Sequence, residues 1–197
     1  KPDARNSPSI DFIALNSLNN TVYPYNYQTS CGIIFMSVTI RQASPQDADA
    51  IYNMINGLSV YRESPKEAVP DVEDIRTSLF SADTAAEAYI CEVDGNVAGY
   101  SVVSMSYSTW LGRYSLNMED LYFIPDYRGL GAGKAMLQYI AQLAVSRKCS
   151  RIEWNVLEWD KSAKDFYLSI DALPLSEWVR YRLDGPALER FATREII

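Results

Sequence analysis

A glycine-rich segment in the second half of the chain has residue types and a spacing that could do chemistry. The segment consists of Arg128, Gly129, Leu130, Gly131, Ala132, Gly133 and Lys134. A turn of this composition directly before a helix can bind phosphate, because backbone N–H groups and the positive end of the helix dipole face the ligand. The alternative is a merely flexible turn, which three glycines at alternate positions before an amphipathic helix disfavour. The segment therefore predicts a site for a phosphate-bearing molecule.

Two common nucleotide-binding motifs do not fit these residues. A P-loop has glycine where this chain has Arg128, and it has Ser or Thr where this chain has Ala135. A dinucleotide-binding loop needs a third glycine that would fall on Lys134 or Met136, depending on the glycine at which the motif starts. The phosphate-bearing ligand is therefore not predicted to be bound in either of these ways.

Strand and helix patterns alternate along the chain around this segment. Apolar periodicity, capping residues and turn residues predict each element. The elements are a strand at residues 38–40, helices at 45–60 and 72–80, strands at 88–93, 97–105 and 116–124, a helix at 131–147, a strand at 152–157, a helix at 161–169, a strand at 179–183 and a short C-terminal helix. Asp94-Gly95-Asn96 predicts a tight hairpin, since Asp and Gly tolerate positive φ angles. This order predicts one α/β domain with a mixed sheet.

Residues 1–35 differ from the rest of the chain. They are rich in Asn, Ser, Thr, Tyr and Pro and show no apolar periodicity. We expect them to be an N-terminal extension of unknown role, followed by the domain at residues 36–197. No apolar run approaches the roughly 18 residues of a membrane span, so we expect no membrane partner.

The composition excludes several classes of chemistry. The chain has 197 residues and no histidine, so it has no Ser-His or Cys-His dyad and no His-containing metal site. Its three cysteines form no CxxC pair, so we expect reduced thiols, a cytoplasmic location and no metal. The net charge of −7 disfavours nucleic acid and favours a small cationic partner.

The motif Arg128-x-x-Gly131-x-Gly133 resembles the pyrophosphate-binding motif Q/R-x-x-G-x-G/A of the GCN5-related N-acetyltransferases (GNAT), whose backbone amides hold the pyrophosphate of coenzyme A. Three further segments resemble the branch that contains the diamine, spermidine/spermine and thialysine N-acetyltransferases. They are Met-Glu-Asp-Leu-Tyr-Phe at 118–123, Glu-Trp-Asp-x-x-Ala-x-x-Phe-Tyr at 158–167, and Glu-Trp at 177–178. The resemblance implies a GNAT fold, which is a mixed, splayed sheet with helices on both faces. It also implies acetyl-CoA as co-substrate and a homodimer.

The resemblance also implies catalytic roles. An alkylamine has a pKa near 10.4 and must lose a proton before it attacks a thioester, and the departing thiolate must gain one. We expect Glu119 to hold and deprotonate the amine and Tyr167 to protonate the thiolate. An exposed strand-end carboxylate and a core tyrosine are the structural alternatives for these two residues.

By the same resemblance, cofactor contacts come from three places in the chain. They are Leu121, Tyr122 and Phe123, where a backbone N–H would meet the oxyanion; the glycine-rich segment; and Asp160, Ser162 and Ala163. Carboxylates and indoles attract ammonium groups, which suggests a set of substrate-binding residues. This set is Glu119, Asp120, Trp110, Glu153, Trp154, Glu177 and Trp178, beside the nearby Glu158. Solvated charges and core tryptophans are the alternative. Asp120 should face away from Glu119 unless the strand has a bulge there.

Two positions depart from the family pattern. Tyr61-Arg62 stands where the pattern of the polyamine acetylases is Tyr-Glu. The charge of Arg62 would repel the distal ammonium of a polyamine. Asp171 stands in place of the usual glycine after Tyr167, and we expect a changed turn there. The repulsion by Arg62 disfavours spermine and favours a short diamine or a lysine-like substrate. The resemblance as a whole implies acetylation of a small cationic amine, which is a diamine, a polyamine or a lysine-like amino acid such as thialysine. A peptide or protein amine acetyltransferase and a non-catalytic acyl-CoA sensor are the alternatives.

Overall fold

The computed structural model describes residues 20–29, 32–63 and 70–194. The chain forms two compact units, of which the first ends at Asn155 and the second begins at Val156. The strands are β1 (Thr21–Thr29), β2 (Gly32–Gln42), β3 (Ala86–Val93), β4 (Asn96–Ser108), β5 (Arg113–Phe123) and β6 (Ile152–Trp154). The helices are α1 (Ala48–Tyr61), α2 (Val72–Leu79), α3 (Ala132–Ser146), α4 (Lys161–Leu168) and α5 (Gly185–Ala192), with short 3-10 turns at Pro45–Asp47 and Pro125–Tyr127.

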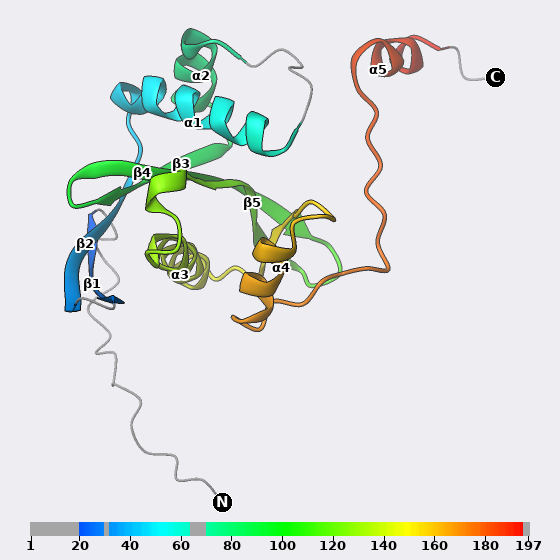
Figure 1. Ribbon diagram of the computed structural model, residues 1–197. Helices are drawn as coiled ribbons and strands as arrows, with labels where there is room; N and C mark the ends of the chain where they lie inside the picture. The colour runs from blue at the N-terminus through cyan, green and yellow to red at the C-terminus, as the bar shows by residue number, and fades with distance from the viewer. Residues whose placement is uncertain (1–19, 30–31, 64–69, 195–197) are drawn as a thin grey trace, which may run out of the picture. The chain divides into compact units, whose positions relative to one another are not determined.

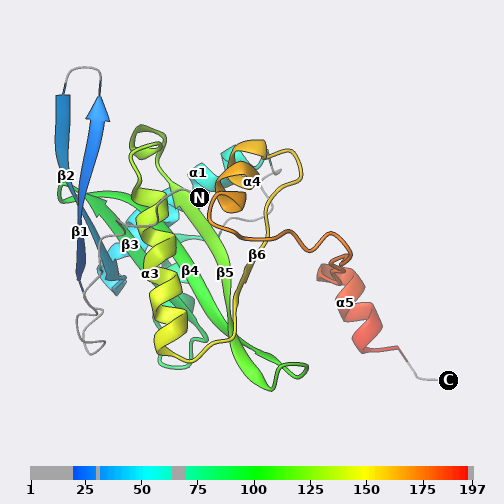
Figure 2. The same ribbon diagram turned by 90° about the horizontal axis from the view of Figure 1, so that it is seen from below.

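The first unit is a six-stranded sheet in which every strand lies beside its neighbour in sequence. The pairs from β1 to β5 are antiparallel, and β6 pairs with β5 in parallel. Helices α1 and α2 lie on one face of this sheet and α3 on the other (Figures 1 and 2). The predicted mixed α/β fold with helices on both faces is confirmed.

One apolar core fills the space between the sheet and helices α1 and α2. Ile51, Met54 and Leu58 form the buried stripe of α1 that their spacing predicts. They pack against Tyr122 of β5, among other sheet residues. Gly57 brings the helix close to that tyrosine, because a Cβ at this glycine would lie 2.4 Å from Tyr122 Oη. The last turns of α1 are thereby pressed against β5.

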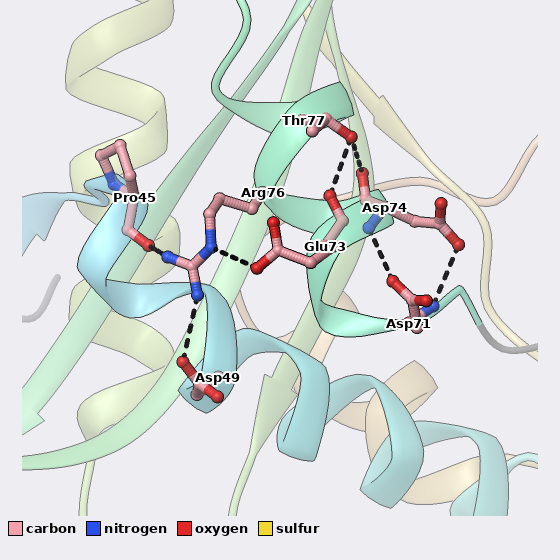
Figure 3. Close-up of polar contacts among 7 residues, drawn as sticks. All are labelled: Pro45, Asp49, Asp71, Glu73, Asp74, Arg76 and Thr77. Carbon is pink, nitrogen blue, oxygen red and sulfur yellow. Dashed lines mark hydrogen bonds and ion pairs between the residues drawn. The ribbon is translucent and has the colours of Figure 1, made fainter.

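Polar contacts fix α2 to the start of α1 (Figure 3). The Arg76 guanidinium donates to the Pro45 carbonyl and pairs with Asp49 at 3.3 Å. Asp71 and Asp74 form a capping box, in which the Asp74 N–H donates to Asp71 Oδ1 at 2.8 Å and the Asp71 N–H donates to Asp74 Oδ2 at 3.1 Å. These bonds satisfy amides that the first turn of a helix leaves without partners.

Helix α3 covers the opposite face with a long apolar stripe, as its sequence predicts. The buried residues of this helix are Ala132, Ala135, Met136, Leu137, Tyr139, Ile140, Leu143 and Ala144. At its C-terminal end, Arg147 Nη2 donates to Glu87 Oε2 of β3 at 2.7 Å. Tyr89 of the same strand donates to that carboxylate at 2.8 Å. The bonds tie the end of α3 to the sheet.

The structure differs from the sequence-based prediction at both ends of the chain. We predicted no regular element before residue 36, yet β1 pairs with β2 from Thr21↔Ile40 to Thr29↔Gly32. As an edge strand, β1 tolerates Pro24, which a central strand would not. The predicted strand at 179–183 is wrong, because this segment has no strand conformation. Residues 1–19 and 30–31 of the predicted extension lie outside the described residues.

Candidate active site

The candidate site of the first unit lies where β5 runs on past the end of β6. The parallel ladder consists of Leu116↔Ile152, Asn117↔Glu153 and Met118↔Trp154. Strand β5 then continues to Phe123, and no strand of the described chain pairs with its last five residues on that side. We call residues 119–123 the open segment of β5. The backbone N–H groups on this edge have no strand partner in the described part of the chain and can bind a ligand, as the predicted splayed sheet requires. Strand β6 is shorter than predicted because its pairing stops here.

A β-bulge begins the open segment. In the ladder with β4, Val103 faces Met118 and Val102 faces Asp120, so that Glu119 is an extra residue in β5. Because Val102 and Val103 are adjacent in β4, Met118 and Asp120 lie on opposite faces of the sheet. Regular alternation predicts that Asp120 faces away from Glu119 unless a bulge intervenes, and the bulge here places the Asp120 side chain on the α1 face.

The Glu119 side chain is exposed. Its carboxylate accepts a hydrogen bond from Asn117 Nδ2 at 3.3 Å, and no cation pairs with it among the residues that the structure describes. This carboxylate can therefore accept the ammonium group of a ligand.

Asp120 is held by partners on both of its oxygens. Arg62 Nη2 lies 3.1 Å from Oδ1, and Tyr100 Oη donates to Oδ2 at 3.1 Å. Ser101 Oγ donates to the Asp120 carbonyl at 2.7 Å and so supports the backbone at the bulge. Burial raises the pKa of the Asp120 carboxyl, and the charge of Arg62 and the hydrogen bond from Tyr100 oppose this rise. Burial also raises the pKa of the Tyr100 hydroxyl, which stays protonated.

Arg128 folds back from the glycine-rich segment toward β5. Its Nε donates to the Phe123 carbonyl at 2.9 Å. The guanidinium carbon lies 5.0 Å from the centre of the Tyr61 ring and 5.3 Å from that of Tyr122, within the range of cation–π contacts. These contacts fix the start of the glycine-rich segment to the end of the open segment.

The glycine-rich segment has the backbone geometry of an anion-binding turn. Gly129 and Gly131 have φ angles of 74° and 82°, which glycine adopts without strain. Gly131 is the N-cap of α3, which has no side-chain cap and no acidic residue in its first turn. By contrast, the Asp71 side chain caps α2. The α3 amides of Ala132 and Gly133 therefore suit an external anion such as pyrophosphate.

The second unit carries the remaining predicted catalytic and cofactor residues. Asp160 is buried and caps α4, because the Ala163 N–H donates to Asp160 Oδ1 at 3.0 Å. Tyr167 is half-buried in the same helix, with its ring 5.5 Å from that of Phe166. Ser162 lies exposed in the first turn.

The turn after Tyr167 is made without glycine. Asp171 adopts a φ of 62°, in the left-handed region that glycine would take. The Ala172 N–H then donates to the Tyr167 carbonyl at 3.1 Å and ends α4. Asp in place of glycine therefore strains the backbone at residue 171, while the end of α4 keeps its hydrogen bond.

The other predicted substrate-binding residues are spread over both units. Trp154 makes the last ladder pair, directly before the open segment. Trp110 lies in the turn before β5 and is 94% exposed, at the opposite end of this strand from Glu119. Glu177 and Trp178 are exposed in the second unit. The substrate roles of these residues stay predictions.

Basic residues pair with several of the predicted acids. Besides Asp120, Glu153 pairs with Arg151 at 3.0 Å and Glu158 pairs with Lys164 at 2.6 Å. These ion pairs reduce the negative charge that the sequence assigned to the acceptor site.

Sequence reasoning missed Tyr100 as a partner of Asp120, because alternation alone marks it only as a core residue. The sequence did mark the position of Arg62, because this residue departs from the family pattern.

Comparison with known proteins identifies the class. The family model of the acetyltransferase (GNAT) family matches residues 51–170, which is more than half of the chain. The chain therefore belongs to the GNAT family and is an acetyltransferase. GNAT acetyltransferases use acetyl-CoA, and the uncapped start of α3 fits the pyrophosphate of that co-substrate.

Individual relatives place the chain more closely within the family. It is 32% identical over 156 residues to a thialysine N-epsilon-acetyltransferase of Caenorhabditis elegans, covering 78% of this chain and 96% of that protein. A thialysine N-epsilon-acetyltransferase of Sus scrofa is 31% identical over 167 residues, covering 79% and 98%. Among solved structures, an integron cassette protein from V. cholerae has a TM-score of 0.69 at 20% identity, covering 80% of this chain and 98% of that one. This last likeness supports the fold alone.

The search for membrane-spanning helices gave none in the described part of the chain.

Proposed function

We propose that this protein transfers the acetyl group of acetyl-CoA directly to the primary amine of a small cationic molecule. The observation that carries the proposal is the meeting of the open segment with the start of α3. Phe123 ends the open segment, and a Cβ at Gly133 of α3 would lie 3.7 Å from the Phe123 ring. A ligand held by its phosphates at the first turn of α3 can therefore extend a thioester along β5.

The proposed roles follow the chemistry of each group. Amides of the glycine-rich segment hold the pyrophosphate, and a backbone N–H between Leu121 and Phe123 stabilises the oxyanion. Glu119 accepts the ammonium group of the substrate and takes its proton, directly or through water. Tyr167 donates a proton to the departing sulfur. Asp160, Ser162 and Ala163 of the second unit are proposed to contribute to coenzyme A binding.

The proposed reaction balances without a covalent enzyme intermediate. The substrate ammonium loses a first proton to Glu119, which passes it to water. The neutral amine nitrogen then attacks the thioester carbon, so that a C–N bond forms and the C–S bond breaks. The nitrogen loses a second proton to Glu119 and from there to water, and the thiolate takes the phenol proton of Tyr167. The tyrosinate recovers a proton from solvent, and the products are an acetamide and free coenzyme A.

A small amine acceptor is supported by the names of two relatives, which are thialysine N-epsilon-acetyltransferases. The net charge of −7 favours a cationic substrate by long-range attraction. We also propose a homodimer and a cytoplasmic location, which light scattering and cell fractionation test.

The experiment is a thiol-release assay with acetyl-CoA and a panel of lysine, thialysine, ornithine, putrescine, spermidine and a lysine peptide. We expect turnover of at least one free small amine by the wild type. Glu119→Gln and Tyr167→Phe should each lower kcat by about 10²–10⁴-fold, the range for loss of a general acid or base. Glu189→Gln and Tyr107→Phe change the same groups at exposed positions outside the proposed roles and should keep wild-type rates. Turnover of the peptide alone would contradict the small-amine acceptor, and wild-type activity of a variant would remove that residue from the mechanism.

A further inference from the structure

We infer that Arg62 selects the acceptor by binding the carboxylate of an amino-acid substrate whose side-chain amine is acetylated. This inference rests on the proposed function and names its substrate class. The group that Arg62 would recognise is an α-carboxylate, which lysine-like amino acids carry and diamines lack. Arg62 is then a specificity-determining residue.

The fold places Arg62 at the start of the open segment. It is the C-cap residue of α1, and its N–H donates to the Leu58 carbonyl at 2.9 Å. Close packing of Gly57 against Tyr122 holds this end of the helix on β5. Arg62 therefore reaches Asp120, the residue that follows Glu119 in the strand.

Asp120 is poorly suited to bind a second ammonium group of a substrate. Both of its oxygens already have partners, which are Arg62 and Tyr100. Its side chain is only 19% exposed. Asp120 instead compensates the charge of Arg62 and orients the guanidinium from one side.

Arg62 keeps capacity for a second carboxylate. A guanidinium has five N–H donors, and among the described residues a single Arg62 side-chain donor is bonded, the Nη2 that faces Asp120. The side chain is 40% exposed, so that a ligand carboxylate can approach it from solvent. A planar guanidinium binds a carboxylate through two parallel hydrogen bonds, a geometry that an ammonium group lacks.

The charges around the open segment match a zwitterionic substrate better than a polycation. Glu119 and Asp120 supply two negative charges, and Arg62 and Arg128 supply two positive charges. A diamine would meet no excess of negative charge here. An amino acid with a side-chain amine can place that amine at Glu119 and its carboxylate at Arg62, with its α-ammonium group left in solvent.

The test compares matched acceptors that differ only in the carboxylate. The pairs are lysine with cadaverine, ornithine with putrescine, and lysine with lysinamide. For each pair, kcat/KM is measured at saturating acetyl-CoA with the wild type, Arg62→Gln and Arg62→Glu. Arg113→Gln and Arg113→Glu make the same charge changes at the other end of β5 and serve as controls.

We expect the wild type to prefer the carboxylate-bearing member of each pair by at least about tenfold, the factor that one charge-assisted hydrogen bond provides. Arg62→Gln should remove this preference mainly through a higher KM for the amino acid. Arg62→Glu should reverse it in favour of the diamine. The Arg113 variants should keep the wild-type ratio.

An unchanged ratio in Arg62→Gln, with all acceptors slowed equally, would overturn the inference and show that Arg62 only supports the fold. The comparison of lysine with lysinamide uses only the wild type. It therefore tests the inference even if the Arg62→Gln protein folds poorly. Equal use of both by the wild type would also overturn the inference. Failure of the proposed function gives a different result, because no small amine of either kind would then be acetylated.

Discussion

The substitution Gly133→Ala should separate binding of coenzyme A from stability of the fold. Gly133 lies in the first turn of α3, and a Cβ there would meet Phe123 ring carbons at 3.7 and 3.8 Å, which is ordinary van der Waals contact. The protein alone therefore has room for alanine. Alanine is better than glycine in a helix interior by about 1 kcal/mol, and a first-turn position should realise part of this. We expect the melting temperature to rise by about 1–3 °C for a chain of this size.

The same methyl group should leave the binding of coenzyme A nearly unchanged. The pyrophosphate-binding motif that these residues resemble accepts Gly or Ala at the position of Gly133, so the first-turn amides should still reach the phosphates in the variant. We expect the dissociation constant to change by less than about threefold, whereas loss of one hydrogen bond to a charged group, about 1.5–3 kcal/mol, would weaken binding by roughly 10–150-fold. Isothermal titration calorimetry with coenzyme A and thermal unfolding of the free protein measure the two effects separately.

Gly57→Ala is the comparison variant, because it makes the same change in another helix. Here the new Cβ would lie 2.4 Å from Tyr122 Oη and 2.9 Å from the ring carbon that bears it. Tyr122 is buried, so the overpacking should cost about 1–3 kcal/mol and exceed the gain in helix propensity of about 1 kcal/mol. We expect a lower melting temperature for this variant. A Gly133→Ala protein that binds coenzyme A at least about tenfold more weakly than the wild type would refute our explanation of that position.

Two further substitutions test local features of the fold. The Arg41 guanidinium lowers the pKa of Asp47 from 3.8 to about 2, so this pair stabilises the fold above about pH 4 and the effect is lost as the pH falls toward 2. Asp47→Asn should therefore lower the free energy of unfolding by about 2 kcal/mol at pH 7 and by little near pH 2. Chemical denaturation at both pH values measures this difference. An equal loss of stability at both pH values would exclude the charge as the cause. Asp171→Gly should relieve the left-handed strain and stabilise the end of α4 by about 0.5–1 kcal/mol. Slower hydrogen exchange at the Ala172 amide would report this gain, and faster exchange would contradict it.

Local sequence signals were sufficient for much of the fold. The apolar spacing of α1 and α3 predicted both helices and their buried faces, since a helix on a sheet buries one stripe. The hairpin between β3 and β4 was predicted from turn residues alone. Asp94 and Gly95 adopt φ angles of 49° and 79°, as a two-residue hairpin turn requires.

Strands were harder to predict where their formation depends on a partner. Residues 179–183 alternate apolar and basic side chains, but the described chain offers them no strand to pair with, and Tyr181 is 91% exposed. Conversely, we predicted no strand at residues 21–29, although Tyr23, Tyr25 and Tyr27 alternate there, and this segment forms a strand because β2 supplies the hydrogen bonds. Alternation reports which face of a strand is buried and not whether a neighbouring strand exists.

The candidate site shows the same limit for charged residues. The sequence singled out an acidic set and a net charge of −7, which together suggested a site for a small cationic amine. Ion pairing depends on tertiary contacts, and three of these acids, Asp120, Glu153 and Glu158, have basic partners. The bulge at Glu119 in β5 determines which of the two adjacent carboxylates is available to a ligand. It leaves the Glu119 carboxylate exposed and brings Asp120 to Arg62. The acceptor is therefore better predicted from the individual charges at the open segment than from the charge of the whole chain.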